Sequence, residues 1–291
     1  MSQIAYFRIF ILLLFFKISV LEAKLVKPSK NGEEKEILLI NGKRRLYYPI
    51  NNDGIQYLVE GPARLEFISR YPALRKKKKS HSFNYSIVID GKDTVAVRHR
   101  YKIQNSIRSV QHPKHKYTYS GNYFINLDRG SHTVDLIQDD EQKYPVLIRV
   151  LTKDFESVGE NKKVLLPMVH QEPVKLQTGG KSISYFECSN SYPLQVEVGG
   201  RKTLRILTRL QFTDMMGQEE SYRIKVKEGA KIIGTYYFNT DRSSGSQIVG
   251  RMDKVPGKWR TCDIKVPKGI HRYNIEISDK GKTVLTRFIV Y

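Results

Sequence analysis

The sequence has few cysteines, few acidic residues and few long apolar runs. Cysteine occurs only twice in 291 residues, at Cys188 and Cys262, which excludes a small scaffold held together by disulfides. After residue 23 no stretch resembles a membrane span, which needs about 20 apolar residues. Asp and Glu number 29 against 50 Lys and Arg, so the net charge is +21. This balance favours anionic partners: an acidic glycan, a lipid headgroup surface or nucleic acid.

The motifs of common catalytic and metal sites are also lacking. There is no Gly-x-Ser-x-Gly elbow, no His-Glu-x-x-His pair and no Cys-His nucleophile pattern. Gly180-Lys181-Ser182 resembles the end of a phosphate-binding loop, but Lys175 stands where that loop needs its first glycine. His112 and His115 lack the two further ligands that zinc requires. We therefore expect no catalytic residue, no metal and no cofactor, and we predict that the protein is not an enzyme.

The N-terminus is typical of a secretory signal. Arg8 supplies a positive charge, residues 9–16 form an unbroken apolar run, and Ala23 is a suitable last residue before cleavage. Lys17 ends the run too early for a bilayer span. We predict a signal peptide over residues 1–23, a secreted or periplasmic location, and no transmembrane span after signal removal.

Three segments of the sequence recur once, in the same order. The recurring pairs are 59–70 with 198–209, 127–132 with 266–271, and 146–149 with 284–287. The offset is 139 residues for the first two pairs and 138 for the third. Such even spacing indicates two copies of one domain. Features that both copies keep are expected to belong to the scaffold.

Within each copy the apolar residues alternate with period two. Residues 85–89 precede a turn at Asp90-Gly91, and their counterparts 222–226 precede Glu228-Gly229. Tyr, Val, Ile, Phe and Thr dominate these runs, as strands prefer. The predicted fold is all-β: two tandem, internally duplicated antiparallel β-sandwich domains, Ig-like in architecture, with about seven to nine short strands each. The expected segments are a signal peptide (1–23), a flexible N-terminal segment (24–34), a basic β-sandwich domain (35–151), a linker (152–171) and a second β-sandwich domain (172–291).

Several repeated or paired residues need an interpretation. An even number of cysteines in a secreted chain permits a disulfide between Cys188 and Cys262, which we then expect on neighbouring strands, and two buried thiols are the alternative. His132 and His271 occupy equivalent sites, where each is expected to bind a backbone carbonyl in its turn. The arginine pairs Arg70/Arg209 and Arg149/Arg287 recur in apolar strands and are expected to be structural.

The strongest local signal is the positive charge of residues 75–116. This segment has twelve Lys and Arg against two Asp, whereas the matching loop of the second copy, 212–220, is acidic. Aromatic residues interleave with the cations, as in proteins that bind phosphate- or sulfate-bearing polymers. A solvated loop is the alternative. The predicted polyanion-binding residues are Arg75, Lys76, Lys77, Lys78, Lys79, Arg98, Arg100, Lys102, Lys114 and Lys116.

Three hypotheses about function follow. The first is a non-enzymatic binding or adaptor protein of the cell envelope or surface, whose first domain contacts an anionic polymer such as a glycan or lipid headgroups. The second is a carbohydrate-binding or carbohydrate-processing protein with its site between the domains. The third is a structural subunit of an envelope assembly, with protein partners on its exposed sheet edges. No specific nucleic-acid partner is expected.

Overall fold

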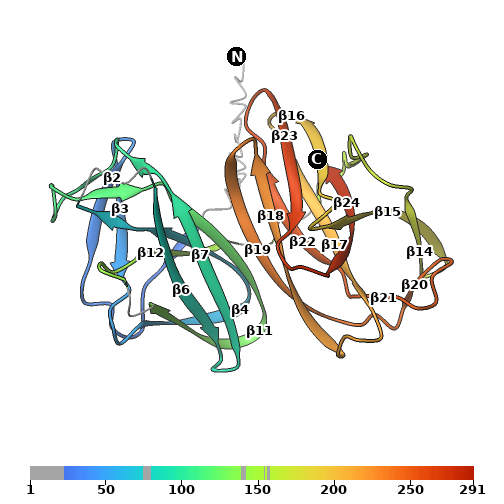
Figure 1. Ribbon diagram of the computed structural model, residues 1–291, viewed down its shortest axis with the longest axis horizontal. Coiled ribbons are helices and arrows are strands. Elements are labelled where there is room, and N and C mark those ends of the chain that lie inside the picture. Colours follow the sequence, from blue (N-terminus) through green and yellow to red (C-terminus); the bar gives the residue numbers. More distant parts are fainter. Residues whose placement is uncertain (1–22, 75–79, 139–141, 154, 156–157) are drawn as a thin grey trace, which may run out of the picture.

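The computed structural model describes residues 23–74, 80–138, 142–153, 155 and 158–291. Strands make up 65% of the chain and helices 0%, so the predicted all-β class is confirmed. In the described ranges no helix has the length and apolar character that a membrane crossing demands. Two β-sandwiches lie side by side along the long axis (Figure 1), which confirms the tandem arrangement.

The described residues of the first half form twelve strands. They are β1 (Lys24–Val26), β2 (Glu36–Ile40), β3 (Lys43–Pro49), β4 (Ile55–Arg70), β5 (Pro72–Ala73), β6 (His81–Ile89), β7 (Asp93–Tyr101), β8 (Ile103–Gln104), β9 (Arg108–Ser109), β10 (Lys116–Thr118), β11 (Gly121–Gln138) and β12 (Leu147–Lys153).

The second half contains another twelve. They are β13 (Lys163–Leu165), β14 (Val174–Thr178), β15 (Lys181–Ser189), β16 (Leu194–Gly199), β17 (Thr203–Phe212), β18 (Glu219–Glu228), β19 (Lys231–Asp241), β20 (Ser246–Ile248), β21 (Val255–Pro256), β22 (Arg260–Lys265), β23 (Ile270–Ile277) and β24 (Thr283–Val290).

Each half has two layers around its own core. In the second half β16, β23, β18 and β19 form one layer, and β22, β17, β24, β15, β14 and β20 form the other. The first half has the same strand order, but β4 and β11 are long enough to run through both layers. The apolar residues of each alternating strand face inward, and they build one large core per half.

The strand register repeats along with the strand order. Ile125 lies opposite Leu65 in the first half, and Ile264 lies opposite Leu204 in the second. In the same way Arg149 pairs with Ile68, and Arg287 pairs with Leu207. All these positions are related by the offsets read from the sequence. The predicted internal duplication is therefore confirmed at the level of individual residue pairs. One expected counterpart is shifted: pairing with the neighbouring strand places Tyr85 at the position of Ile224, so residues 85–89 correspond to 224–228 and not to 222–226.

Gly61 and Gly200 occupy equivalent positions, and the structure shows why both copies keep glycine there. A Cβ on Gly61 would lie 1.7 Å from the carbonyl oxygen of Asp128, and one on Gly200 would lie 2.1 Å from that of Pro267. Both contacts are with backbone atoms, which cannot move aside cheaply. Each copy thus needs glycine where its two central strands cross from one layer to the other.

The expected boundaries differ from those of the structure at both copy starts. We expected residues 24–34 to be flexible, but their beginning forms β1, which pairs with β12. In the expected linker 152–171, β13 pairs with β24 in the same way, 139 residues later. Each copy therefore begins with a short edge strand, and the connection between β12 and β13 is limited to residues 154–162. A three-residue strand is too short to show a periodic sequence pattern.

The prediction that the two cysteines lie on neighbouring strands is wrong. Cys188 is on β15 and Cys262 is on β22, with β24 and β17 between them in the same layer. Both thiols are free and fully buried. Burial raises the pKa of Cys188 to about 12 and that of Cys262 higher still. Both residues pack as small apolar side chains in the second core, as the buried-thiol alternative held.

The repeated histidines and the arginine pair Arg70/Arg209 make scaffold contacts, as expected. His132 binds the carbonyl oxygen of Asp128 at 3.1 Å, and His271 binds that of Lys268 at 3.3 Å. Arg70 donates to the carbonyl of Thr118. In the second copy Arg209 donates to the equivalent carbonyl, that of Gly257.

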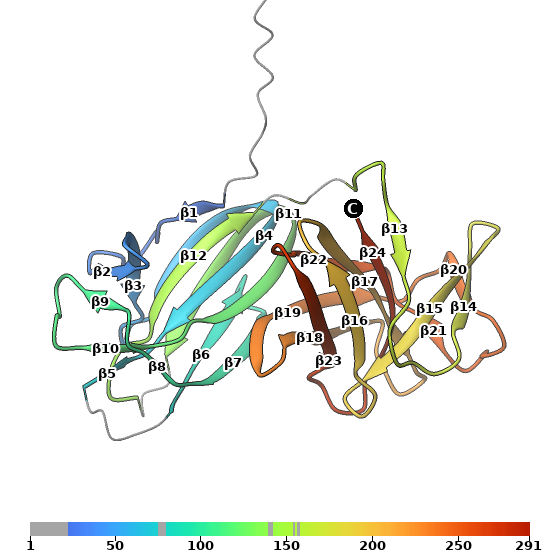
Figure 2. The same cartoon turned by 90° about the horizontal axis from the view of Figure 1, so that it is seen from above.

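The two halves are joined by a short parallel strand pairing. Tyr123, Phe124 and Ile125 of β11 pair with Thr235, Tyr236 and Tyr237 of β19; Figures 1 and 2 both show these strands adjacent. The ring of Phe124 belongs to the core of the second half and stacks on Tyr236, with ring centroids 4.5 Å apart. Tyr237 packs in turn against the core of the first half.

Gly234 should be essential to this junction. A Cβ there would lie 2.5 Å from the ring of Phe124, and the equivalent residue of the first half is Val95. We expect Gly234→Val to lower the free energy of unfolding by about 1–3 kcal/mol or more, because the added methyl groups overlap the ring. Urea unfolding measures this. Gly199→Ala, with open space around its Cβ position, is the control and should shift the midpoint little. Equal effects of both changes would contradict the role of Gly234.

His99 should make the first half sensitive to acid. Its Nε2 is buried without a partner in the part of the chain that the structure describes, and its ring lies 5.2 Å from Phe83. Desolvation lowers the pKa of His99 to about 4. The unfolded chain, with a pKa near 6.5, therefore binds more protons between these values, and stability falls as the pH drops through this window.

The second copy supplies the matching variant, because Phe238 stands at the position of His99. We expect His99→Phe to remove about 1–3 kcal/mol of the stability difference between pH 7 and pH 4.5. Urea unfolding at both pH values measures this difference. An unchanged pH dependence in His99→Phe would show that His99 is not its source.

Candidate functional site

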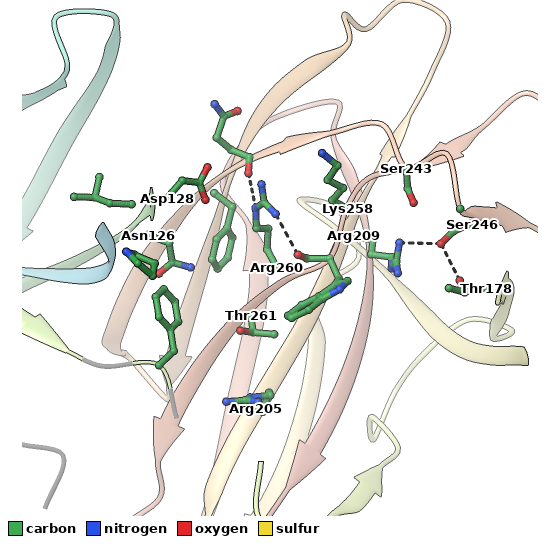
Figure 3. A pocket seen from close by; sticks show the side chains of 17 residues that line it. Asn126, Asp128, Thr178, Arg205, Arg209, Ser243, Ser246, Lys258, Arg260 and Thr261 are labelled. Atoms are coloured by element: carbon green, nitrogen blue, oxygen red, sulfur yellow. Dashed lines mark hydrogen bonds between the residues drawn. The ribbon is translucent and has the colours of Figure 1, made fainter. Parts of the chain in front are cut away.

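A pocket of about 700 Å³ is lined by residues of both halves. Figure 3 shows that side chains of both halves converge on it. The first half contributes the β11 residues Asn126 and Asp128, and Phe155 of the connecting segment also lines it. The second half contributes residues of β17, β19 and β22, the segment around β20 and the two residues before β22. They include Arg205, Arg209, Asn239, Ser246, Lys258, Trp259 and Arg260.

Trp259 is the only tryptophan of the chain, and its side chain remains in solvent. It lies just before β22 and is 58% exposed, although a ring of this size is normally well buried. Lys258 and Arg260 flank it in the sequence. The pairing of β22 with β17 fixes the following residues, Arg260 and Thr261, opposite Thr208 and Leu207. The indole therefore stands on a rigid strand end rather than on a loose loop.

Arg209 is buried at one wall of this pocket. It is 6% exposed, and its Nη1 donates to Ser246 Oγ at 3.2 Å and to the carbonyl of Gly257 at 3.0 Å. Ser246 in turn accepts a hydrogen bond from Thr178 at 2.8 Å (Figure 3). The Nε of Arg209 has no partner in the described ranges. In the first copy the same atom of Arg70 donates to the hydroxyl of Tyr47.

The other cations of the pocket differ in how they are neutralised. Arg205 forms a two-point ion pair with Asp263, at 2.7 and 3.0 Å. Lys258 pairs with Asp241 at 2.6 Å. Arg260 instead donates to the backbone carbonyls of Asn239 and Trp259, at 2.6 and 3.4 Å.

Two guanidinium groups therefore keep an uncompensated charge at this pocket. Among the described residues, neither Arg209 nor Arg260 forms an ion pair with a carboxylate. Asp128 is the only described carboxylate in the pocket lining. A flat aromatic face beside fixed cations provides stacking and hydrogen-bond donors for a ring-shaped ligand that carries acceptor or anionic groups.

None of the predicted polyanion-binding residues that the structure describes lines this pocket. Arg75, Lys76, Lys77, Lys78 and Lys79 lie outside the described residues. Arg98 and Arg100 are exposed on the same outer face of β7, and Lys102 follows that strand. Lys114 is exposed between β9 and β10, and Lys116 begins β10. Their role in binding stays a prediction.

Arg100 also lines a separate hollow of about 720 Å³ in the first half, together with Lys143 and Tyr144. Within the described ranges, no group of three or more His, Cys, Asp and Glu residues is arranged to hold a metal ion.

Sequence reasoning missed Trp259 and Arg260. Their signal was present, because Lys258-Trp259-Arg260 interleaves cations with an aromatic residue, as the basic segment does on a larger scale. Three residues do not stand out in a chain with 50 Lys and Arg. Only the tertiary structure shows that these three line a pocket together with residues of the first half.

No family model and no curated protein matches the sequence. Among solved structures, the tandem CBM51 modules of a family 98 glycoside hydrolase from Streptococcus pneumoniae share 11% identity, with 92% of this chain and 93% of that chain covered and a TM-score of 0.23. The CBM22-1–CBM22-2 tandem domain of Xyn10C from Paenibacillus barcinonensis shares 12% identity over 92% and 90%, with a TM-score of 0.22.

PNGF-II shares 9% identity with this chain, over 93% of this chain and 64% of that chain, with a TM-score of 0.24. Overlaps this loose define neither the fold in detail nor the function. The fold of this chain is given by its own strand pairing.

Proposed function

We propose that this protein is a secreted, non-enzymatic glycan-binding protein whose pocket between the two halves takes a sugar residue of an anionic glycan. The observation that carries the proposal is the exposed ring of Trp259 beside Arg209 and Arg260, whose charges no described carboxylate neutralises. Sugar rings present apolar faces to aromatic side chains and hydroxyl or acidic groups to guanidinium donors.

The construction of the pocket also supports binding. Burying Arg209 with one N–H unpaired is costly, and a ligand acceptor at Nε would offset that cost. A volume of about 700 Å³ lies within the range of small-ligand sites, and it has room for more than one sugar ring. Most of the pocket wall comes from strands, among them β11, β17, β19 and β22, so those side chains need little ordering on binding.

The absence of a described carboxylate pair favours binding over cleavage. Both common mechanisms of glycoside hydrolysis use two carboxyl groups on either side of the scissile bond. Among the described lining residues only Asp128 has one. The predicted signal, of which residues 1–22 lie outside the described ranges, directs such a protein to the envelope or the cell surface, where anionic glycans occur.

Trp259 makes the proposal directly testable, because it is the single tryptophan and reports only on this pocket. We expect sulfated or uronate-containing oligosaccharides to change its fluorescence saturably, and neutral oligosaccharides to bind more weakly. The affinity for the anionic probes should fall as salt rises, because the cations become screened. A fluorescence unaffected by every probe would contradict the proposal.

The matched variants are Trp259→Ala and Tyr192→Ala, since Tyr192 is an equally exposed aromatic residue of the second half, at 60%. Calorimetric titration with the best anionic probe should show a roughly tenfold to hundredfold loss for Trp259→Ala, the effect of truncating an aromatic platform under a stacked ring. Tyr192→Ala should bind as the unchanged protein does. Equal affinity of Trp259→Ala and the unchanged protein would exclude the pocket.

A further inference from the structure

The first half contains a second pocket, of about 450 Å³, built around a buried carboxylate. It lies at the end of the first sandwich where β2, β5, β9 and β10 meet, away from the second half (Figure 2). Glu36 forms part of its wall and is 6% exposed. A buried carboxylate is expensive unless it is fully hydrogen-bonded, so its neighbours are informative.

Three protein donors satisfy Glu36. The Ser109 hydroxyl donates to its Oε1, and the Tyr117 hydroxyl donates to the same oxygen at 2.9 Å. Its other oxygen, Oε2, lies 2.9 Å from Nδ1 of His112. This contact holds the His112 ring with its second nitrogen, Nε2, turned away from Glu36. The His112 side chain is 54% exposed, and no described residue is bonded to Nε2.

The second copy shows that the sandwich does not need this cluster. The register places Val174 at the position of Glu36, because each lies opposite the first tyrosine of the next strand, Tyr185 and Tyr47. Ile248 stands at the position of Ser109, opposite Leu176 as Ser109 is opposite Leu38. An apolar cluster of Val174, Leu176 and Ile248 fills that site.

The remaining positions differ as well. At the places of Pro49 and His112 the second copy has Glu187 and Arg251, which pair with each other. The second copy thus has an ion pair where the first copy has an open pocket beside an imidazole. The buried carboxylate of the first copy costs stability that the scaffold could avoid, and this points to a role in binding.

The pocket walls are flat and largely apolar. His115 stacks on His112 with ring centroids 4.7 Å apart and an angle of 10°, and the ring of Tyr144 lies 6.3 Å from His115. Pro72 and Pro145 complete the apolar surface. Such walls suit a ring with apolar faces, and the free imidazole nitrogens suit hydroxyl groups at its edge.

We infer that this pocket is a second sugar site, which binds one uncharged sugar residue through the free nitrogen of His112 and the stacked ring of His115. The carboxylates of Glu34 and Glu36 outnumber the single ammonium group of Lys35 in the lining and disfavour an anionic ligand here, in contrast to the pocket at Trp259. The choice of a sugar rests on the proposed glycan-binding function. Two sites of different charge preference would recognise a glycan that contains both acidic and neutral residues, with a gain from simultaneous binding.

Imidazole nitrogen NMR of the full chain tests this site separately from the first. Neutral methyl glycosides of glucose, galactose and N-acetylglucosamine are the probes, and the methyl glycoside of glucuronic acid is the charged comparison. We expect one neutral glycoside to shift the His112 and His115 signals saturably and the charged one to bind more weakly. The same shifts should appear in Trp259→Ala, which separates this site from the pocket between the halves.

Two variants complete the experiment. Glu36→Val introduces the residue that the second copy has at this position. It should weaken glycoside binding about tenfold, because His112 loses the hydrogen bond that orients its ring toward the ligand. His115→Ala leaves Glu36 in place and should weaken it by a similar factor. Binding equal in both variants and the unchanged protein, or no saturable shift with any neutral glycoside, would overturn the inference. If Trp259 fluorescence still responds to anionic probes in that case, the proposed function itself stands.

Discussion

The rest of this structure depends on the parallel pairing of β11 with β19. Three residue pairs join the two halves, and the ring of Phe124 extends from the first half into the core of the second. Fully burying a phenylalanine contributes about 1.5–3 kcal/mol, which is substantial for such a short contact. Arg64 adds a buried link, because its guanidinium contacts both Asp263 and the carbonyl of Thr261. The halves are therefore fixed relative to each other, and so are the walls of the pocket between them.

The duplication provides an internal control for every position. Residues kept in both copies, such as Gly61 and Gly200, perform backbone tasks that either sandwich needs. Residues that differ show where the fold leaves a choice. Trp259 has Ser120 as its counterpart, and Glu36 has Val174. Both proposed sites consist largely of such copy-specific residues.

Net charge alone does not show where an anion binds. Of the cations at the pocket between the halves, Arg205 and Lys258 are neutralised by Asp263 and Asp241. Arg209 and Arg260 donate only to hydroxyl and carbonyl oxygens among the described residues, so their charge remains available to a ligand. The chain has 50 Lys and Arg, and the principal partners of these four lie 17 to 58 residues away in the sequence.

The sequence by itself determined the all-β class, the two copies and the register of the three recurring segments, because alternation and a constant offset are local or periodic signals. It misaligned residues 85–89 by two positions, because alternation with period two is equally satisfied after a shift of two residues. It also identified the scaffold contacts of His132, His271, Arg70 and Arg209, since both copies keep them, whereas the unpaired Nε of Arg209 became apparent only in the structure. It did not predict that two strands separate Cys188 from Cys262, because the order of strands within a sheet cannot be read from local sequence patterns. Tertiary structure alone decided that the missing side chain of Gly234 leaves space for the ring of Phe124, that Trp259 lines a pocket shared with the first half, and that Glu36 is buried beside His112. Each of these depends on contacts between residues far apart in the chain, which no local pattern specifies.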